Sequence, residues 1–189
     1  MKHKITILIV FLICLSTSGF TQNKFRKYVA DHQIDTNYLK SIDADNFREI
    51  LPLQKGKLTW VVIFTNSCPG TKYVLGNVKK TISEYKDVNV MLCSSAPYRR
   101  IPELMEVLKK NEITFPTVYI INSDRHKDKR FDEREKGFLF RKEICEECRK
   151  DIIGVPYSII YNDAGTVIQY GYIHSEELFP LFDKHSKEL

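Results

Sequence analysis

The four residues Cys68-Pro69-Gly70-Thr71 have the types and spacing best suited to chemistry in this chain. They follow residues 59–65, whose β-branched and aromatic composition is typical of a buried strand. After them, apolar residues recur at helical spacing through residues 74–85. Cys68 therefore lies where a strand passes into a helix, beside unpaired amide N–H groups and the positive end of the helix dipole, which favour a thiolate. Because the thiolate is the nucleophilic form of cysteine, this pattern predicts a reactive thiol.

Three further cysteines follow Cys68 in the chain. Cys93 comes at the end of a second apolar strand, residues 88–92, and is either a small core residue or a redox thiol. Cys145 and Cys148 are spaced i and i+3 on an expected helix, so their sulfur atoms could pair or bind a metal jointly. A zinc site would need a second ligand pair, and the sequence shows none at a suitable spacing. A redox dithiol, a structural disulfide and unpaired thiols stay open for this pair, and we expect no metal and no cofactor.

Strands and helices must position these residues, and the apolar pattern predicts that they alternate. Beyond the first two strands we expect further strands near residues 117–121, 155–161 and 166–170. We expect helices near residues 45–51, 101–108 and 175–182, and through Cys145 and Cys148 to Gly154. Pro180 should kink or shorten the last helix. The charged segment from Asp124 to Lys136 is typical of a hydrated loop or of the exposed face of an insertion.

Residues 1–21 have the basic, apolar and small-residue order of a secretory signal peptide, and the apolar run is too short to span a bilayer. We therefore expect an exported protein, periplasmic or secreted, that meets the membrane only through this signal or a lipid anchor at Cys14. Bulky Ile13 and Leu15 argue against the lipid anchor. Residues 22–56 are expected to form an N-terminal extension, and residues 57–189 the main domain.

The charge and cysteine content exclude some functional classes. The net charge of +5 includes Lys2 and Lys4, so the chain after cleavage carries about +3, too weak and too evenly mixed to indicate nucleic acid binding. Of the five cysteines, Cys14 is removed with the signal. The rest are too few for a disulfide scaffold in a chain of this length.

The order of strand, cysteine-containing helix, strand, helix, Gly154-Val155-Pro156 hairpin and terminal helix resembles the thioredoxin superfamily. The long connection between Ser94 and Gly154 is most similar to that of TlpA-like exported thiol–disulfide oxidoreductases. The resemblance implies an α/β thioredoxin-like fold: a central mixed sheet flanked by helices, with an N-terminal extension and an insertion before the cis-proline hairpin.

The resemblance also implies roles for the hairpin residues. The family's cis proline packs against the active-site sulfur, which implies that role for Pro156, and the backbone of Val155 would then bind an extended substrate. Pro116 competes for the role, because Phe115-Pro116-Thr117 also opens a strand. We prefer Pro156, since only it precedes the family's Asp163-Ala164-Gly165 hairpin.

Two residues depart from the family pattern. Ser67 stands where the family has a tryptophan, which leaves a smaller and more polar substrate-binding lip beside the sulfur. Thr71 stands where the family has its resolving cysteine, so the fast intramolecular release of a mixed disulfide is lost. We expect the Thr71 hydroxyl to donate to the Cys68 thiolate. The predicted function is thiol–disulfide exchange through one nucleophilic cysteine, with protein or small-molecule thiols and disulfides as partners.

Two alternatives remain. Thr65-Asn66-Ser67-Cys68-Pro69 also resembles the Thr-x-x-Cys-Pro of peroxiredoxins, in which a distant arginine, here Arg141 or Arg149, helps to position a peroxide. Val61 replaces the proline that precedes that motif. The other alternative is a non-catalytic thioredoxin-fold binding module in which Cys68 is inert. The sequence alone places no Asp, Glu or His behind Cys68 as a proton shuttle.

Overall fold

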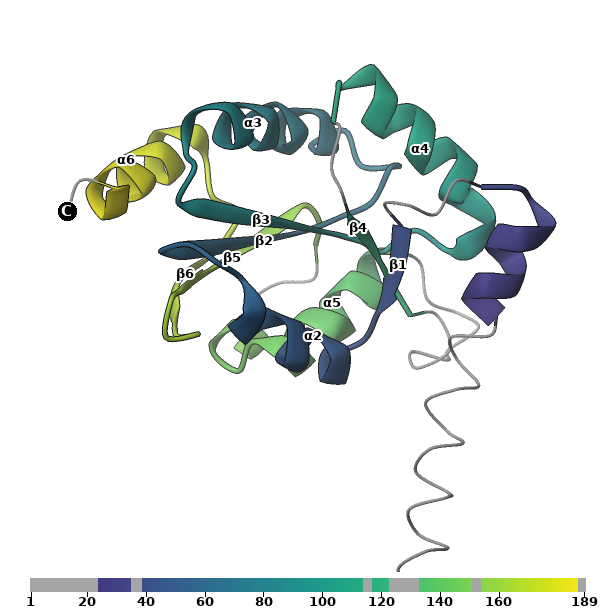
Figure 1. The fold of residues 1–189 in the computed structure, drawn as a ribbon, viewed down its shortest axis with the longest axis horizontal. Coiled ribbons are helices and arrows are strands. Elements are labelled where there is room, and N and C mark those ends of the chain that lie inside the picture. Colours follow the sequence, from purple (N-terminus) through teal and green to yellow (C-terminus); the bar gives the residue numbers. More distant parts are fainter. Residues whose placement is uncertain (1–23, 35–38, 114–116, 123–132, 151–153, 187–189) are drawn as a thin grey trace, which may run out of the picture.

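A mixed sheet forms the centre of the protein in the computed structural model, which describes residues 24–34, 39–113, 117–122, 133–150 and 154–186 (Figure 1). Within these residues the sheet has six strands in the order β1-β4-β3-β2-β5-β6. Their bounds are β1 (Leu39–Ile42), β2 (Leu58–Phe64), β3 (Val88–Ser94), β4 (Val118–Ile121), β5 (Tyr157–Asn162) and β6 (Val167–Gly171). Neighbours from β1 to β2 are parallel, whereas β5 runs antiparallel to both β2 and β6.

Helices cover both faces of this sheet, which confirms the expected α/β architecture. Figure 1 shows α3 (Thr71–Glu84), α4 (Ile101–Lys110) and α6 (Ser175–Ser186) on one face, and α2 (Ala44–Ile50) and α5 (Glu133–Ile144) on the other. Residues 24–31 are also helical. Short 3₁₀ helices lie at η1 (Leu51–Leu53), η2 (Tyr98–Arg100) and η3 (Glu147–Lys150).

Strand β2 is buried on both faces and divides the core in two. Trp60, Val62 and Phe64 join the cluster beneath α3, α4 and α6, whereas Val61 and Ile63 join the cluster beneath α2 and α5. This alternation follows from the two-residue period of a strand. Every residue of β2 is buried, as expected for a strand covered by helices on both sides. The strand therefore gives the residues that follow it a rigid starting point.

The segment expected to be an extension contributes to this sheet. Strand β1 pairs in parallel with β4 from Leu39 opposite Val118 to Ile42 opposite Ile121. Ile42 and Phe47 are fully buried beneath α5. The expected boundary at residue 57 therefore does not coincide with a break in packing. A strand of four residues has too short an alternating pattern to stand out in a sequence.

Two helices differ from the sequence prediction. Helix α6 continues through Pro180 to Ser186, so the expected shortening is wrong; the buried side chains of Leu178 and Phe182 hold both sides of the proline against the core. Helix α5 starts inside the segment expected to be hydrated, at Glu133. It ends at Ile144, so the cysteine pair lies just beyond the α-helix rather than within it.

Some expectations fall on residues outside the described ranges. These are the signal peptide of residues 1–21 with Cys14, the competing Pro116, and residues 124–132 of the charged segment. Among the described residues, none of the helices has the length and apolar character needed to cross a membrane.

Candidate active site

A short loop between β2 and α3 holds Cys68. Phe64, the last residue of β2, has its carbonyl bound by both the amide (2.8 Å) and the hydroxyl (3.2 Å) of Ser95. The loop then closes on itself, since Cys68 N donates to Thr65 O at 3.4 Å and Thr71 N donates to Cys68 O at 3.0 Å. The N-cap of α3 is Gly70, which has no side chain to cap the helix. Cys68 therefore lies just before the start of the helix on a backbone fixed at both ends.

The sulfur of Cys68 faces the segment before β5. Cys68 is partly exposed, and its Sγ donates to the carbonyl oxygen of Val155 at 3.1 Å. The Val155–Pro156 peptide bond is cis. A Cβ atom added to Gly70 would lie 3.1 Å from Pro156 Cδ and 3.7 Å from Cys68 Sγ, so the glycine lets loop and proline approach closely. A carbonyl accepts only from the protonated thiol, so this hydrogen bond belongs to the neutral form of Cys68 and is lost when the thiol ionises.

The hydroxyl of Thr71 has a different partner from the one expected. Thr71 is buried, and its Oγ1 donates to Thr65 O at 2.6 Å. A hydroxyl carries a single proton, so this contact replaces the expected donation to the Cys68 thiolate. Thr71 instead closes the loop that holds Cys68, together with the backbone bonds.

A carboxylate that the sequence interpretation missed lies beside this loop. Glu133, the first residue of α5, accepts from Ser67 Oγ at 2.9 Å and from the hydroxyl of Thr65. Arg100 donates to the other oxygen of this carboxylate and also binds Glu103 at 2.7 Å. The hydrogen bonds from Arg100, to Glu103 first and then to Glu133, raise the pKa of the guanidinium above its ordinary value.

The sequence signal that could have placed Glu133 on the inner face of α5 is the helical spacing of the buried residues that follow it. The buried residues of α5 are Lys136, Gly137, Phe140 and Arg141. Counted from Glu133, they are spaced i+3, i+4, i+7 and i+8, which defines one helical face. Because Lys136 and Arg141 are charged, this face does not look apolar in the sequence. The expectation of a hydrated segment is therefore wrong for the described residues Glu133 and Lys136.

Lys136 lies on this inward face. Its Nζ donates to the carbonyl oxygen of Ala96 at 3.0 Å, and the side chain is buried. Burial lowers the pKa of Lys136 to about 7, and the nearby negative charge of Glu133 partly opposes this shift. A buried lysine with a lowered pKa thus contacts the segment that follows β3.

Cys93 lies inside the core. It is fully buried in β3, with Ile63 of β2 and Tyr119 of β4 opposite it. Burial raises the pKa of its thiol, which keeps the thiol protonated and poorly nucleophilic. This environment is that of a small core residue.

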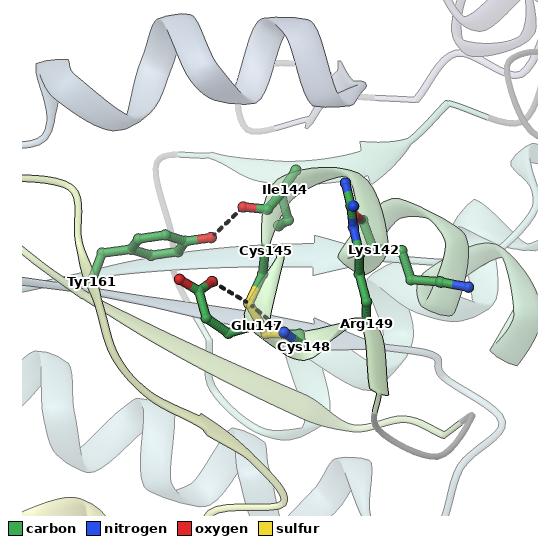
Figure 2. Close-up of a disulfide and its surroundings, with 7 residues drawn as sticks. All are labelled: Lys142, Ile144, Cys145, Glu147, Cys148, Arg149 and Tyr161. Atoms are coloured by element: carbon green, nitrogen blue, oxygen red, sulfur yellow. Dashed lines mark hydrogen bonds between the residues drawn. A yellow bond between two sulfur atoms is a disulfide. The ribbon is translucent and has the colours of Figure 1, made fainter.

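Cys145 and Cys148 form a disulfide (Figure 2), with Cα atoms 5.3 Å apart and both side chains buried. The pair follows the C-terminus of α5, whose last carbonyl groups have partners. Tyr161 Oη donates to Ile144 O at 2.8 Å, and Arg149 Nε to Lys142 O at 3.1 Å. Arg48 of α2 donates to Glu143 O at 2.8 Å. The disulfide therefore lies next to the capped C-terminus of α5, at the opposite end of the helix from Glu133.

The two arginines considered for a peroxide site have other contacts. The guanidinium of Arg141 stacks over the ring of Tyr157 at 3.9 Å. Arg149 is exposed beside the disulfide, 3.6 Å from Glu146. The hydroxyl of Thr65 donates to Glu133, and the arginine bound to that carboxylate is Arg100. This arrangement differs from the one that the peroxiredoxin resemblance implies.

Comparison with known proteins supports the fold. Neither a scan of protein-family models nor a search of curated proteins finds a match. A solved thioredoxin domain of a thiol–disulfide oxidoreductase from Bacteroides vulgatus has a TM-score of 0.51 and 16% identity, covering 69% of this chain and 79% of that one.

Two other solved structures are less similar in shape. A thiol:disulfide interchange protein from Bacteroides sp. has a TM-score of 0.48 and 16% identity, with 68% and 72% of the two chains covered. A secreted disulfide oxidoreductase from Mycobacterium tuberculosis has a TM-score of 0.46 and 11% identity, with 69% and 83% covered. The similarity to the Bacteroides vulgatus domain shows that this chain has a thioredoxin-like fold; at such identity it shows the fold alone.

Proposed function

We propose that this protein is an exported thioredoxin-like thiol–disulfide oxidoreductase that uses Cys68 as its single nucleophile. The observation that carries the proposal is the partly exposed sulfur of Cys68, held 3.1 Å from the Val155 carbonyl between a helix start and Pro156. When the thiol ionises and this hydrogen bond is lost, the Val155 backbone becomes free to pair with an extended substrate. Ser67, exposed beside the sulfur, would contact the same substrate.

The first step is an attack on a disulfide. The Cys68 thiolate forms a new S–S bond with one substrate sulfur, and the other substrate sulfur leaves as a thiolate. The proton of Cys68 passes to solvent and the leaving thiolate takes one up, so the charge balances. The substrate disulfide is the oxidant, and no cofactor is required.

The second step needs a thiol from outside. The Thr71 hydroxyl cannot take the role of a resolving cysteine. Within the described residues the other free thiol is Cys93, which is buried, and Cys145 and Cys148 are already joined. A thiolate from a protein or a small molecule therefore attacks the mixed disulfide, forms a new disulfide with the substrate sulfur and releases the Cys68 thiolate.

Export rests on the sequence pattern of residues 1–21. An oxidising compartment would supply disulfide substrates and is compatible with the Cys145–Cys148 bond. The small net charge of the remaining chain argues against nucleic acid as a partner.

Trapping the mixed disulfide tests the proposal. Residues 22–189 would be mixed with a dipyridyl disulfide, and the release of thiopyridone and the masses of peptides would be followed. We expect one adduct at Cys68, formed at least as fast as with a free cysteine at the same pH. Cys68→Ser should abolish this adduct, whereas Cys93→Ser, in the core, should leave it unchanged.

Other results would favour the alternatives. A Cys68 that stays unmodified in the folded protein would contradict exchange and favour a binding module. Hydrogen peroxide that is consumed within seconds by Cys68, with loss of the activity in Thr65→Val, would favour a peroxidase.

A further inference from the structure

We propose that Glu133 is a positioning residue for Cys68 and acts through the hydroxyls of Thr65 and Ser67. This inference rests on the proposed function, because it concerns how the nucleophilic thiol is held. It assigns a role in the exchange reaction to helix α5, which lies far from Cys68 in the sequence.

The contacts of Glu133 join it to the loop on the N-terminal side of Cys68. One carboxylate oxygen accepts from both Ser67 Oγ, at 2.9 Å, and the Thr65 hydroxyl. A carboxylate has enough lone pairs to accept from two hydroxyls and a guanidinium at once. The side chain of Glu133 is only 14% exposed and its bond with Thr65 is partly buried, whereas its bond with Ser67 lies at the surface. The loop therefore has a fixed, charged anchor next to the reactive residue.

Arg100 in turn fixes the orientation of the carboxylate. Its guanidinium donates to Glu133 and to Glu103, where the Nε contact is 2.8 Å. Asn66 of the loop donates to the same oxygen of Glu103 at 3.3 Å. The planar guanidinium fork restrains the direction of both carboxylates. The loop is thus linked to the start of α4 as well as to α5.

Helix α5 also supports the opposite side of the thiol. A Cβ atom added to Gly137 would lie 3.1 Å from both Val155 Cγ1 and Ile63 Cγ2, so the helix backbone rests directly on these residues. The carbonyl of Val155 is the acceptor for Cys68 Sγ. One helix therefore contacts both segments that flank the sulfur, the loop through Glu133 and Val155 through Gly137.

Glu133 could affect Cys68 in two ways, by positioning the loop or simply by placing a negative charge near the thiol. Removing the carboxylate would change the rate of attack by Cys68 in opposite directions in the two cases. A negative charge near a thiol disfavours the thiolate, so removing it would speed the attack. Loss of an anchor would instead let the loop depart from its reactive geometry and slow the attack. The sign of the change therefore identifies the role.

The test compares variants in the reaction with a dipyridyl disulfide. Glu133→Ala should slow the second-order rate roughly tenfold, as a small misplacement of reacting atoms does. Glu133→Gln should restore part of the rate, because its amide oxygen still accepts from the hydroxyls, whereas its NH2 group cannot accept from Arg100. Glu135→Gln removes a carboxylate from the same first turn of α5 and should not change the rate. Urea unfolding of each variant gives the fraction folded, to which the rates are corrected.

A double-mutant cycle tests whether Glu133 acts through the two hydroxyls. A general structural role of Glu133 would not depend on them. In the Thr65→Val/Ser67→Ala background, Glu133→Ala should no longer slow the reaction, because its targets are gone. Should Glu133→Ala fail to fold, the Thr65→Val/Ser67→Ala protein by itself should react roughly tenfold slower than wild type.

Three results would overturn the inference: faster reaction of both Glu133→Ala and Glu133→Gln, equal slowing by Glu133→Ala in the two backgrounds, or a wild-type rate in Thr65→Val/Ser67→Ala. In each of these cases Cys68 of the wild-type protein still reacts, so the proposed function stands. Failure of the proposed function is different, because the wild-type thiol itself would not react.

Discussion

Thr71 is a buried residue at the position where the thioredoxin resemblance implies a resolving cysteine. We predict that Thr71→Cys shortens the lifetime of the Cys68 adduct sharply, because an adjacent thiolate attacks within the molecule. The change also removes the 2.6 Å hydrogen bond to Thr65 O, at a cost of about 1 kcal/mol in unfolding free energy. Mass spectrometry of the adduct over time measures the lifetime, and urea unfolding measures the stability.

Thr71→Ser is the matched control, since it keeps the hydroxyl and should keep the long-lived adduct. A wild-type protein that releases its adduct as fast as Thr71→Cys would show that a resolving thiol already exists. Peptide mapping would then link Cys68 to Cys93, Cys145 or Cys148.

Burial of Lys136 predicts a stability that depends on pH. The pKa of Lys136 falls from 10.5 to about 7 on folding, so between these values the unfolded chain keeps a proton that the folded protein has lost. Where the unfolded state binds more protons, the free energy of unfolding rises with pH. Below pH 7 both states carry the charge, and the folded state bears the cost of burying it, which the charge of Glu133 partly offsets.

We therefore predict that Lys136→Met has a higher unfolding free energy than wild type, and that this advantage is largest at acidic pH. The advantage should shrink by at most about 1.4 kcal/mol per pH unit as pH rises through this window. Urea unfolding of both proteins from about pH 6 to about pH 10 measures the difference. Lys109→Met, on the exposed surface of α4, is the control and should show no such trend. If the difference in unfolding free energy between Lys136→Met and wild type stays constant with pH, the pKa of Lys136 does not fall on folding.

Among the elements, α5 makes different kinds of contact at its two ends. The disulfide and the caps from Arg48, Arg149 and Tyr161 secure its C-terminus, whereas Glu133 and Gly137 meet the active loop and Val155. We predict that Cys145→Ser/Cys148→Ser lowers the unfolding free energy by about 2 kcal/mol, the chain-entropy value for so short a loop. Formation of the Cys68 adduct should stay intact, because the reacting contacts lie at the other end of the helix.

Wild-type protein under a reductant is the matched comparison and should unfold like the double variant. Glu146 and Glu147 lie beside the pair, and neighbouring carboxylates disfavour a second negative charge, so these thiols should attack poorly once reduced. Loss of adduct formation in the double variant would show that the first nucleophile is in this pair and not at Cys68.

Local patterns predicted the elements whose signals are contiguous. The apolar run before Cys68, the helical spacing after it and the Asn162-Asp163-Ala164-Gly165 turn each lie within a few residues, and β2, α3 and the β5–β6 hairpin follow from them. The contact of Glu133 with Ser67 joins residues far apart in the chain, and nothing local encodes it. The bond from Thr71 to Thr65 O was missed because several acceptors compete for one hydroxyl proton, and only the folded loop decides among them.

At the scale of the whole molecule, the described part of residues 22–56 bears directly on stability. Strand β1 covers the outer edge of β4, and Phe25, Val29, Leu39, Ile42 and Phe47 add buried apolar surface to the two core clusters. Each fully buried side chain of this size contributes about 2 kcal/mol, so their combined loss is comparable to the net stability of a typical domain.

We therefore predict that residues 57–189, the domain expected from the sequence, do not fold stably by themselves, whereas residues 22–189 unfold in one cooperative transition. Near-ultraviolet circular dichroism, which reports on packed aromatic rings such as Trp60 against Phe182, should be lost in the shorter chain. Leu53→Ala in the longer chain is the control, since this exposed side chain belongs to the same segment but not to either core cluster, and it should unfold like wild type. A cooperative transition at the same urea concentration in both chains would show that the domain begins at residue 57 after all, and that β1 is an accessory strand.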